Sequence, residues 1–267
     1  MSTLVRARAR TDMDDADVLA AQVKAGNVRA VSRAITWLED LGADGHAILQ
    51  AFKPSQRRSA VIGVTGYPGA GKSTLIDQLI TAYRQQGKTV GVLAIDISSP
   101  RTGGALLGDR IRMRTHALDT GVYIRSMATR GQRGGLARTA REAVTVLDAA
   151  GFDVILLETI GVGQGDVDVL DVADTVLAVV APGLGDDIQA MKAGLLELAH
   201  IIVVYKADHA GAEITLRDLR EWHPHVLSTV AVTGTGMSEV MAAITAHQPV
   251  SPLPREGPSN SDARAVH

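Results

Sequence analysis

A glycine-rich stretch that ends in a lysine and a hydroxyl residue is the first place where residue types and spacing could do chemistry. It fits G-x-x-x-x-G-K-[ST] at every fixed position. An apolar run, residues 61–64, precedes it and apolar residues at helical spacing follow, so it joins a predicted strand to a predicted helix. The stretch and its next residue are Gly66, Tyr67, Pro68, Gly69, Ala70, Gly71, Lys72, Ser73 and Thr74.

This stretch predicts a cradle for nucleotide phosphates. Glycines let the backbone turn its N–H groups inward, where they and the helix N-terminus face an anion. Lys72 would reach the β- and γ-phosphates, and Ser73 would hold Mg²⁺. A glycine-rich turn that matches by chance is the alternative, and the flanking strand and helix argue against it.

Carboxylates follow two other predicted strands. Asp96 ends the second strand and opens a turn-rich loop that also holds Asp109. Glu158 ends the fourth strand, at the position of a Walker-B carboxylate, and Gly161 could give its N–H to a γ-phosphate. Each carboxylate alone is more often a helix cap or a surface charge. Ligands of open α/β sheets gather at the carboxyl ends of strands, so the shared placement favours a nucleotide site.

The sixth predicted strand runs into Tyr205, Lys206 and Asp208. GTPases read guanine here with Asn-Lys-x-Asp: the Asp accepts the guanine N–H protons, the Lys stem packs on the ring, and the Asn buttresses the site. Tyr205 stands where Asn is expected. Lys206 and Asp208 are therefore candidate nucleotide-binding residues from an incomplete motif.

The elements that must position these residues are strands and helices in alternation. Most candidate strands are continuous apolar runs, which is typical of strands buried on both faces, so we expect a three-layer α/β fold with a mostly parallel sheet. The candidate strands are Ala60–Thr65, Thr89–Ile95, Val122–Ile124, Val154–Leu157, Thr175–Val180, Ile201–Val204 and Thr229–Val232.

Helices are predicted between the strands and ahead of them. Residues 14–37 have helical periodicity that Gly26-Asn27 splits in two, and a short helix follows at 45–52. We expect an N-terminal helical extension over 1–57, a P-loop domain over 58–248 and a disordered proline-rich tail over 249–267. The helices of the central domain are predicted at Thr74–Gln86, Leu136–Ala150, Gln189–Ala199 and Glu213–Glu221.

Composition excludes several classes of function. A formal net charge of −2 argues against a broad nucleic-acid-binding surface. The chain has no cysteine, which rules out disulfides, thiolate metal sites and a cysteine nucleophile. It has no apolar run long enough to cross a membrane and no apolar segment typical of a secretory signal. We therefore expect a cytoplasmic protein; a short organellar presequence is the alternative.

Four blocks of sequence resemble the MeaB-type GTPases, long also labelled ArgK, which are P-loop chaperones of adenosylcobalamin-dependent methylmalonyl-CoA mutase. The resemblance is strong over residues 58–208 and weaker elsewhere. The second and fourth strands with their following loops carry the most specific part. The blocks are DISSPRTGGALLGDRIR (96–112), RSMATRG (125–131), ETIGVGQ (158–164) and PGLGDDIQAMK (182–192).

The resemblance implies a Mg²⁺-dependent GTPase that binds GTP and GDP, gates cofactor loading into an adenosylcobalamin-dependent acyl-CoA mutase and protects that enzyme. It places Asp96 and Asp109 in a first switch near the metal and Glu158 in a second. The loop ending at Lys192 resembles an extra switch through which the mutase stimulates hydrolysis; a solvated lysine is the alternative. The implied metal ligands are Ser73, Asp96, Asp109 and Glu158, and the implied catalytic residues are Lys72, Asp96, Asp109, Glu158 and Lys192.

The sequence departs from the family pattern at four places. Ile97 stands where Pro is usual, Tyr205 replaces Asn, and residues 230–232 replace a base-contacting Ser-Ala pair. The long helical C-terminal arm used in homodimerisation is replaced by the proline-rich tail. We therefore expect a monomer or weak homodimer, and a weaker preference for guanine over adenine than a complete motif gives.

Other classes of function stay open. A kinase or transport-associated ATPase would transfer phosphate to a second substrate. A nucleotide-binding scaffold with little hydrolysis is the other, and the Tyr205 departure favours it; a nickel-delivery GTPase is weakened by the absence of cysteine. His223 and His225 could be half a metal site, but no third ligand is spaced to complete it, so we expect a surface loop.

Overall fold

Parallel strands form the centre of the protein. The computed structural model describes residues 15–39, 43–52, 59–96, 114–116, 118–128, 135–159, 170–183, 196–230 and 233–247. Within these residues, seven strands make one sheet in the order β3-β2-β4-β1-β5-β6-β7, and all neighbours are parallel, which confirms the predicted fold class. The strands are β1 (Ala60–Thr65), β2 (Val90–Asp96), β3 (Val122–Ala128), β4 (Val154–Glu158), β5 (Thr175–Val180), β6 (Ile201–Tyr205) and β7 (Val226–Thr229).

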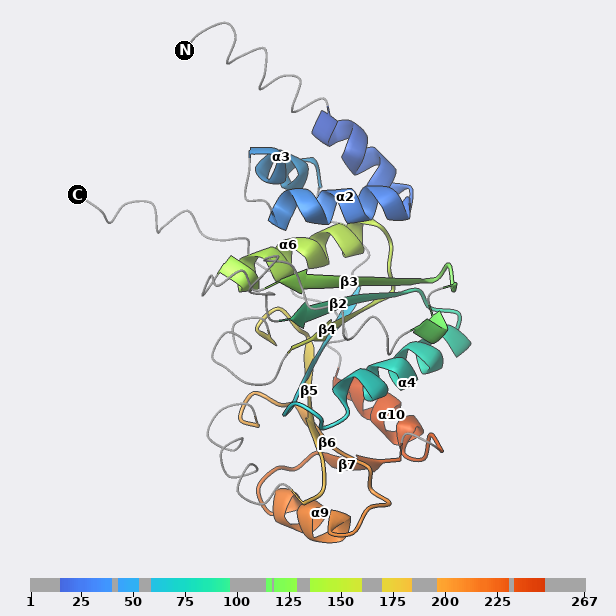
Figure 1. Cartoon of the computed structure of the whole chain (residues 1–267), viewed down its shortest axis with the longest axis vertical. Coiled ribbons are helices and arrows are strands. Elements are labelled where there is room, and N and C mark those ends of the chain that lie inside the picture. The colour runs from blue at the N-terminus through green and yellow to red at the C-terminus, as the bar shows by residue number, and fades with distance from the viewer. Residues whose placement is uncertain are drawn as a thin grey trace, which may run out of the picture.

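Helices cover both faces of the sheet (Figure 1). Alternate strand residues such as Ile62, Val64 and Val203 form one core with α4 (Lys72–Gln85) and α10 (Met237–His247). On the other face, α6 (Gly135–Ala149) covers the β3 side and α9 (Ala212–Arg220) the β7 side. Both faces of the sheet are therefore shielded from solvent, which explains the continuous apolar runs in the strands.

The N-terminal helices pack on the outside of α6. A helix over residues 15–24 is followed by a turn at Gly26, whose φ is 75°. The next helix, α2 (Val28–Glu39), begins after Asn27. The Asn27 Oδ1 accepts hydrogen bonds from the Arg29 and Ala30 N–H groups at 3.0 and 3.1 Å, which caps α2. The predicted split at Gly26-Asn27 is therefore confirmed, and α3 (Ala43–Ala51) agrees with the predicted third helix.

The helical periodicity of residues 14–37 suggests one apolar face, but two apolar side chains of these helices point outward. Leu19, Val31 and Ile35 are buried in a core shared with α6, but Val18 and Val28 are 58% and 50% exposed. The predicted division at residue 58 is not tested by this packing and stays a prediction.

The last strand lies earlier than predicted. β7 covers Val226–Thr229, whereas Val230 makes only an isolated antiparallel bridge with Thr235, and the rest of the predicted strand lies outside the described residues. Pairing with β6 sets this register, because Ile202 aligns with Val226 and Tyr205 with Thr229. Left-handed glycines at 234 and 236 then turn the chain back into α10, a helix the sequence reading missed.

The helices α4, α6 and α9 lie within two residues of their predicted bounds. A short 3-10 helix, η1 (Arg114–His116), precedes β3. The predicted helix at 189–199 is wrong at its end, because Leu196–His200 form a turn, with the Ala199 N–H bonded to the Leu196 carbonyl oxygen; residues 189–195 lie outside the described part. No helix in the described ranges is long and apolar enough to cross a membrane.

Candidate functional site

The glycine-rich loop leaves the carboxyl end of β1 and enters α4. It presses directly on the neighbouring strand, because a Cβ added to Gly66 would lie 2.2 Å from the Val179 carbonyl oxygen of β5. The φ of Gly66 is 138°, so both its backbone conformation and its surroundings require glycine. The loop is thus fixed at the edge of the sheet where ligands of open α/β folds bind.

Lys72 folds back over this loop. Its Nζ donates hydrogen bonds to the Gly66 carbonyl oxygen at 2.6 Å and to the Tyr67 carbonyl oxygen at 3.1 Å. The residue is buried at the first turn of α4. The ammonium group is therefore held where the loop would receive an anion, and it would supply positive charge there.

Ser73 and Glu158 meet between α4 and β4. The Ser73 hydroxyl donates a hydrogen bond of 2.7 Å to Glu158 Oε1, and both side chains are buried. Sheet register produces this contact, because Val64 of β1 aligns with Glu158 of β4. Behind it, the Thr159 hydroxyl donates to the Thr65 hydroxyl at 3.0 Å, which fixes the backbone on both strands.

The Ser73–Glu158 pair fits a small divalent cation. Both groups offer oxygen, the donor atom that Mg²⁺ prefers, and one of them is a carboxylate. Asp96 ends β2, the strand beside β4, so its backbone reaches the same edge of the sheet. In the described part of the chain, no three or more His, Cys, Asp or Glu side chains are grouped so as to hold a metal.

Three predicted site residues lie outside the described residues. They are Asp109, Gly161 and Lys192. Their predicted roles stay predictions.

The predicted base-contacting residues follow β6. Lys206 and Asp208 are exposed, and Lys206 adopts a left-handed φ of 59°, which is uncommon for a residue with a side chain. Tyr205 differs from both, because it is buried and its ring lies under the phosphate loop. Its ring contacts Gly71 of the phosphate loop. The sequence does not predict this contact, because apolar periodicity indicates that a residue is buried but not which residue it packs against.

A group of four histidines, His200, His223, His225 and His247, lies at the opposite edge of the sheet. The rings of His200 and His247 lie 4.1 Å apart, centroid to centroid, and His223 contacts the Ala199 carbonyl oxygen. His225 is exposed, as expected for a surface loop. This group lies at the amino ends of the strands, away from the phosphate loop.

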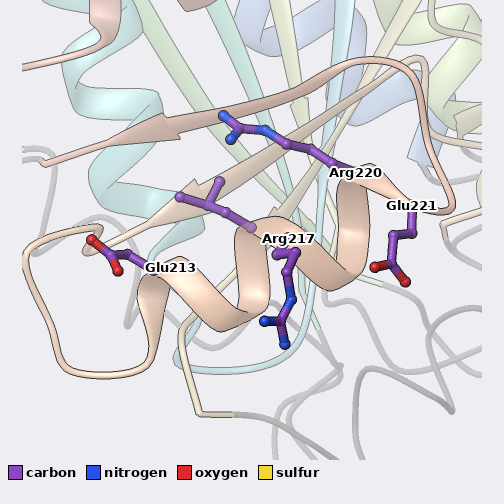
Figure 2. Close-up of a pocket in the computed structure, with 5 residues that line it drawn as sticks. Glu213, Arg217, Arg220 and Glu221 are labelled. Atoms are coloured by element: carbon purple, nitrogen blue, oxygen red, sulfur yellow. The ribbon is translucent and has the colours of Figure 1, made fainter.

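A depression of about 370 Å³ on α9 is a different kind of surface. It is lined by Glu213, Leu216, Arg217, Arg220 and Glu221. Figure 2 shows that the labelled charged side chains come from α9 and its end, and that they point in different directions instead of converging. It therefore offers no defined point for a substrate, and the loop at β1 remains the candidate site.

Known proteins resemble the chain over most of its length. Residues 31–261 match the family described as methylmalonyl-CoA mutase-associated GTPase MeaB. A protein of Pyrococcus horikoshii named as a GTPase is 47% identical over 249 residues, which is 88% of this chain and 78% of that protein. GTPase ArgK of Escherichia coli is 34% identical over 241 residues, 84% of this chain and 73% of that one.

A solved structure has the same fold. The structure of a protein described as LAO/AO transport system kinase superposes with a TM-score of 0.66 at 26% identity. The match covers 92% of this chain and 76% of that one.

Proposed function

Because the chain belongs to the MeaB family of P-loop GTPases, we propose that it hydrolyses GTP to gate cofactor loading into an adenosylcobalamin-dependent acyl-CoA mutase. In this proposal it also protects that mutase from inactivation. The observation that carries the catalytic part is the meeting of Lys72, Ser73 and Glu158 at one edge of the sheet. The mutase as client rests on the family alone.

The residues would divide the work of phosphoryl transfer to water. The N–H groups of the loop and the Lys72 ammonium would bind the β- and γ-phosphates and offset the negative charge that spreads over the transferred group. Ser73 and Glu158, with Asp96 and Asp109, are the residues that would hold Mg²⁺. That ion, when bound with the nucleotide, would neutralise charge between the β- and γ-phosphates.

The base would bind across the loop after β6. Asp208 is exposed and could accept the N–H protons of guanine, while the stem of Lys206 could cover the ring. GTP and GDP are therefore the proposed ligands.

An assay of phosphate release tests the proposal. The full chain is incubated with GTP and Mg²⁺, with and without a purified adenosylcobalamin-dependent acyl-CoA mutase. We expect slow hydrolysis alone and faster hydrolysis with the mutase. Hydrolysis that no such mutase stimulates would contradict the client assignment but not the enzymatic class.

Two lysine variants separate the parts of the proposal. Lys72→Ala should lower turnover by about 100-fold or more, since one preorganised contact to the transferring phosphate is lost. Lys192→Ala should leave intrinsic turnover near normal and remove the stimulation. Lys24→Ala, on the N-terminal helices, is the matched control, because the described contacts of Lys24, with the Ala51 carbonyl oxygen and the Phe52 ring, lie within the N-terminal extension. Equal loss of both rates in Lys192→Ala would make Lys192 an intrinsic or structural residue.

Transfer of phosphate to a protein or small molecule is the alternative, as the kinase name of the structural relative suggests for that protein. The same assay decides, because a kinase would release little inorganic phosphate from GTP without its second substrate.

A further inference from the structure

Tyr205 ends β6 but turns toward the phosphate loop. The alternation of β6 places Ile201, Val203 and Tyr205 in the core beneath α4 and α10. Only 4% of Tyr205 is exposed, whereas the next residue, Lys206, is exposed. The chain therefore passes in one step from a buried aromatic ring to the predicted base-contacting loop.

The ring of Tyr205 lies against Gly71, the last residue before Lys72. A Cβ added to Gly71 would lie 2.3 Å from Tyr205 Cδ1 and 2.4 Å from Cε1, so the ring fills the space that any side chain would need. Gly71 also has a left-handed φ of 104°, which favours glycine on its own account. The ring thus supports the phosphate loop where the loop becomes a helix.

A second contact joins Tyr205 to the start of α4. The Tyr205 hydroxyl faces the Thr74 side chain, and burial raises the pKa of this hydroxyl above its ordinary value. The group therefore stays neutral at the pH of any ordinary assay, and its effect does not depend on titration.

The backbone beyond Tyr205 is equally constrained. Lys206 is left-handed, the Ala207 N–H donates to the Thr229 carbonyl oxygen at 3.2 Å, and the His209 N–H donates to the Lys206 carbonyl oxygen at 3.0 Å. A strained residue held by its surroundings is a common feature of binding loops. Tyr205 stands between this turn and the phosphate loop.

We propose that Tyr205 is a positioning residue that links the base-contacting loop to the phosphate loop. Its ring packs on Gly71 and its hydroxyl faces Thr74, in the place where an asparagine amide buttresses other GTPases. Preorganisation of the loop lowers the cost of ordering it around a nucleotide, so the contact increases affinity without touching the ligand. The proposal needs nucleotide binding by this site and is independent of the mutase as client.

The test compares nucleotide affinity with folding stability in the full chain. The probe is GDP with a fluorescent N-methylanthraniloyl group on its ribose, and thermal unfolding is measured without nucleotide. Tyr205→Leu should raise the Kd for this probe about tenfold or more, because small displacements of a binding loop are costly. Tyr205→Phe keeps the ring and should raise it only about threefold or less, in line with one neutral hydrogen bond.

A matched variant separates positioning from general packing. Tyr123 is also buried, at 5% exposed, but it lies on β3, where its hydroxyl is hydrogen-bonded to Ser32. Tyr123→Leu should lower the thermal midpoint yet leave the Kd within about twofold of wild type, because its cavity lies far from the loop. The proposal is overturned if Tyr205→Leu binds the probe like wild type, or if Tyr123→Leu weakens binding as much.

A double-mutant cycle keeps the proposal testable if Tyr205→Leu does not fold. If the Tyr205 hydroxyl acts through Thr74, Tyr205→Phe should change the Kd in the wild-type chain and have no further effect in the Thr74→Val chain. Equal effects in both chains would overturn the hydroxyl part of the link. If the wild-type chain bound no probe, both this proposal and the nucleotide site would be wrong. If no mutase stimulated hydrolysis, only the client assignment under the proposed function would be wrong, and this proposal would stand.

Discussion

Asp208 is the residue on which the predicted choice of base depends. It is exposed beyond β6, free of the core that holds Tyr205, and its carboxylate can only accept hydrogen bonds when ionised. Guanine offers two neighbouring N–H donors on the edge that this carboxylate would meet, and adenine does not offer that pair. Because Tyr205 supplies no amide, we predict that Asp208 carries a larger share of the discrimination than in a complete Asn-Lys-x-Asp motif.

Asp208→Asn should weaken binding of a non-hydrolysable GTP analogue by about 100-fold, because two charge-assisted hydrogen bonds are damaged. The same variant should improve binding of the corresponding xanthosine triphosphate analogue, because the carbonyl oxygen at C2 of xanthine can accept a hydrogen bond from the new amide. Calorimetry with the two analogues and an ATP analogue measures both changes, and Asp218→Asn on α9 is the control. Equal GTP and ATP affinities in the wild-type chain would contradict the guanine assignment.

Local sequence patterns predict the candidate site residues, but they do not predict which of those residues contact one another. The spacing from Gly66 to Ser73 predicted a phosphate loop because the motif is contained in one turn and its flanking elements. The Ser73–Glu158 hydrogen bond joins residues 85 positions apart and depends on β1 pairing with β4. The packing of Tyr205 on Gly71 likewise depends on β6 lying near the loop, which no local pattern contains.

At the scale of elements, the predicted metal site lies where Ser73 of α4 meets Glu158 of β4. Ser73→Ala removes a hydroxyl that donates to the buried Glu158 and would bind Mg²⁺. The Mg²⁺ concentration for half-maximal hydrolysis should rise about tenfold or more, as for other lost metal-site partners. A magnesium titration of the GTPase rate measures this.

Ser59→Ala is the matched control for that titration. The Ser59 hydroxyl also donates to a carboxylate, Asp148, at 2.9 Å, but ahead of β1 at the opposite edge of the sheet. It should cost stability without changing the need for Mg²⁺. An unchanged magnesium requirement in Ser73→Ala would contradict the assignment of Ser73 as a ligand.

Elements with a strong local signal were predicted well, and elements set by pairing were not. β1 and β5 have the predicted bounds, because turn residues or polar residues bracket short apolar runs. β7 was displaced, since its register comes from β6, and its apolar run Val230-Ala231-Val232 was a more obvious strand than the paired Val226–Thr229. α10 was missed although Met237, Val240, Met241 and Ile244 have helical spacing and are buried.

The amino end of β6 and the end of α10 should make stability depend on pH. Burial lowers the pKa of His200, and the nearby His247 and His223 lower it further. Its Nδ1 accepts a hydrogen bond from the Val176 N–H at 2.9 Å, which requires that nitrogen to be unprotonated. The unfolded chain therefore binds a proton more readily than the folded chain below the ordinary histidine pKa of 6.5.

The free energy of unfolding should then be fully developed above pH 6.5 and fall as the pH decreases below it, toward the lowered pKa of His200. Urea unfolding between pH 8 and pH 5.5 measures the slope. His200→Asn, which cannot titrate, should flatten it, and His209→Gln, at an exposed position, should not. An equal slope in wild type and His200→Asn would contradict this origin.

At the scale of the whole molecule, the N-terminal helices are part of the main core. Leu19, Ile35 and Leu38 share one buried cluster with Leu147 and Leu157. An ion pair between Arg125 of β3 and Glu39 of α2 adds a polar contact at the rim. These helices have thus placed most of their apolar surface inside the protein, which bears on how two copies could associate.

We predict a monomer without nucleotide and, with a GTP analogue, at most a weak dimer formed across the loops near the phosphate site. A stable interface needs upwards of about 1,000 Å² with an apolar centre. The large exposed apolar residues in the described ranges are divided among three parts of the chain: Val18 and Val28 on the N-terminal helices, Leu118 before β3, and Ile214 and Trp222 at α9.

Sedimentation velocity at micromolar concentration, with and without a non-hydrolysable GTP analogue, measures the assembly. Wild type should sediment as a monomer alone, and the analogue should increase the weight-average coefficient in a concentration-dependent way. Lys72→Ala, which should bind the analogue poorly, is the control and should not respond. A tight dimer in both conditions would contradict the prediction. If Val18→Ser with Val28→Ser dissolved that dimer, the N-terminal helices would be the interface, because those two are the large exposed apolar side chains in the described part of these helices.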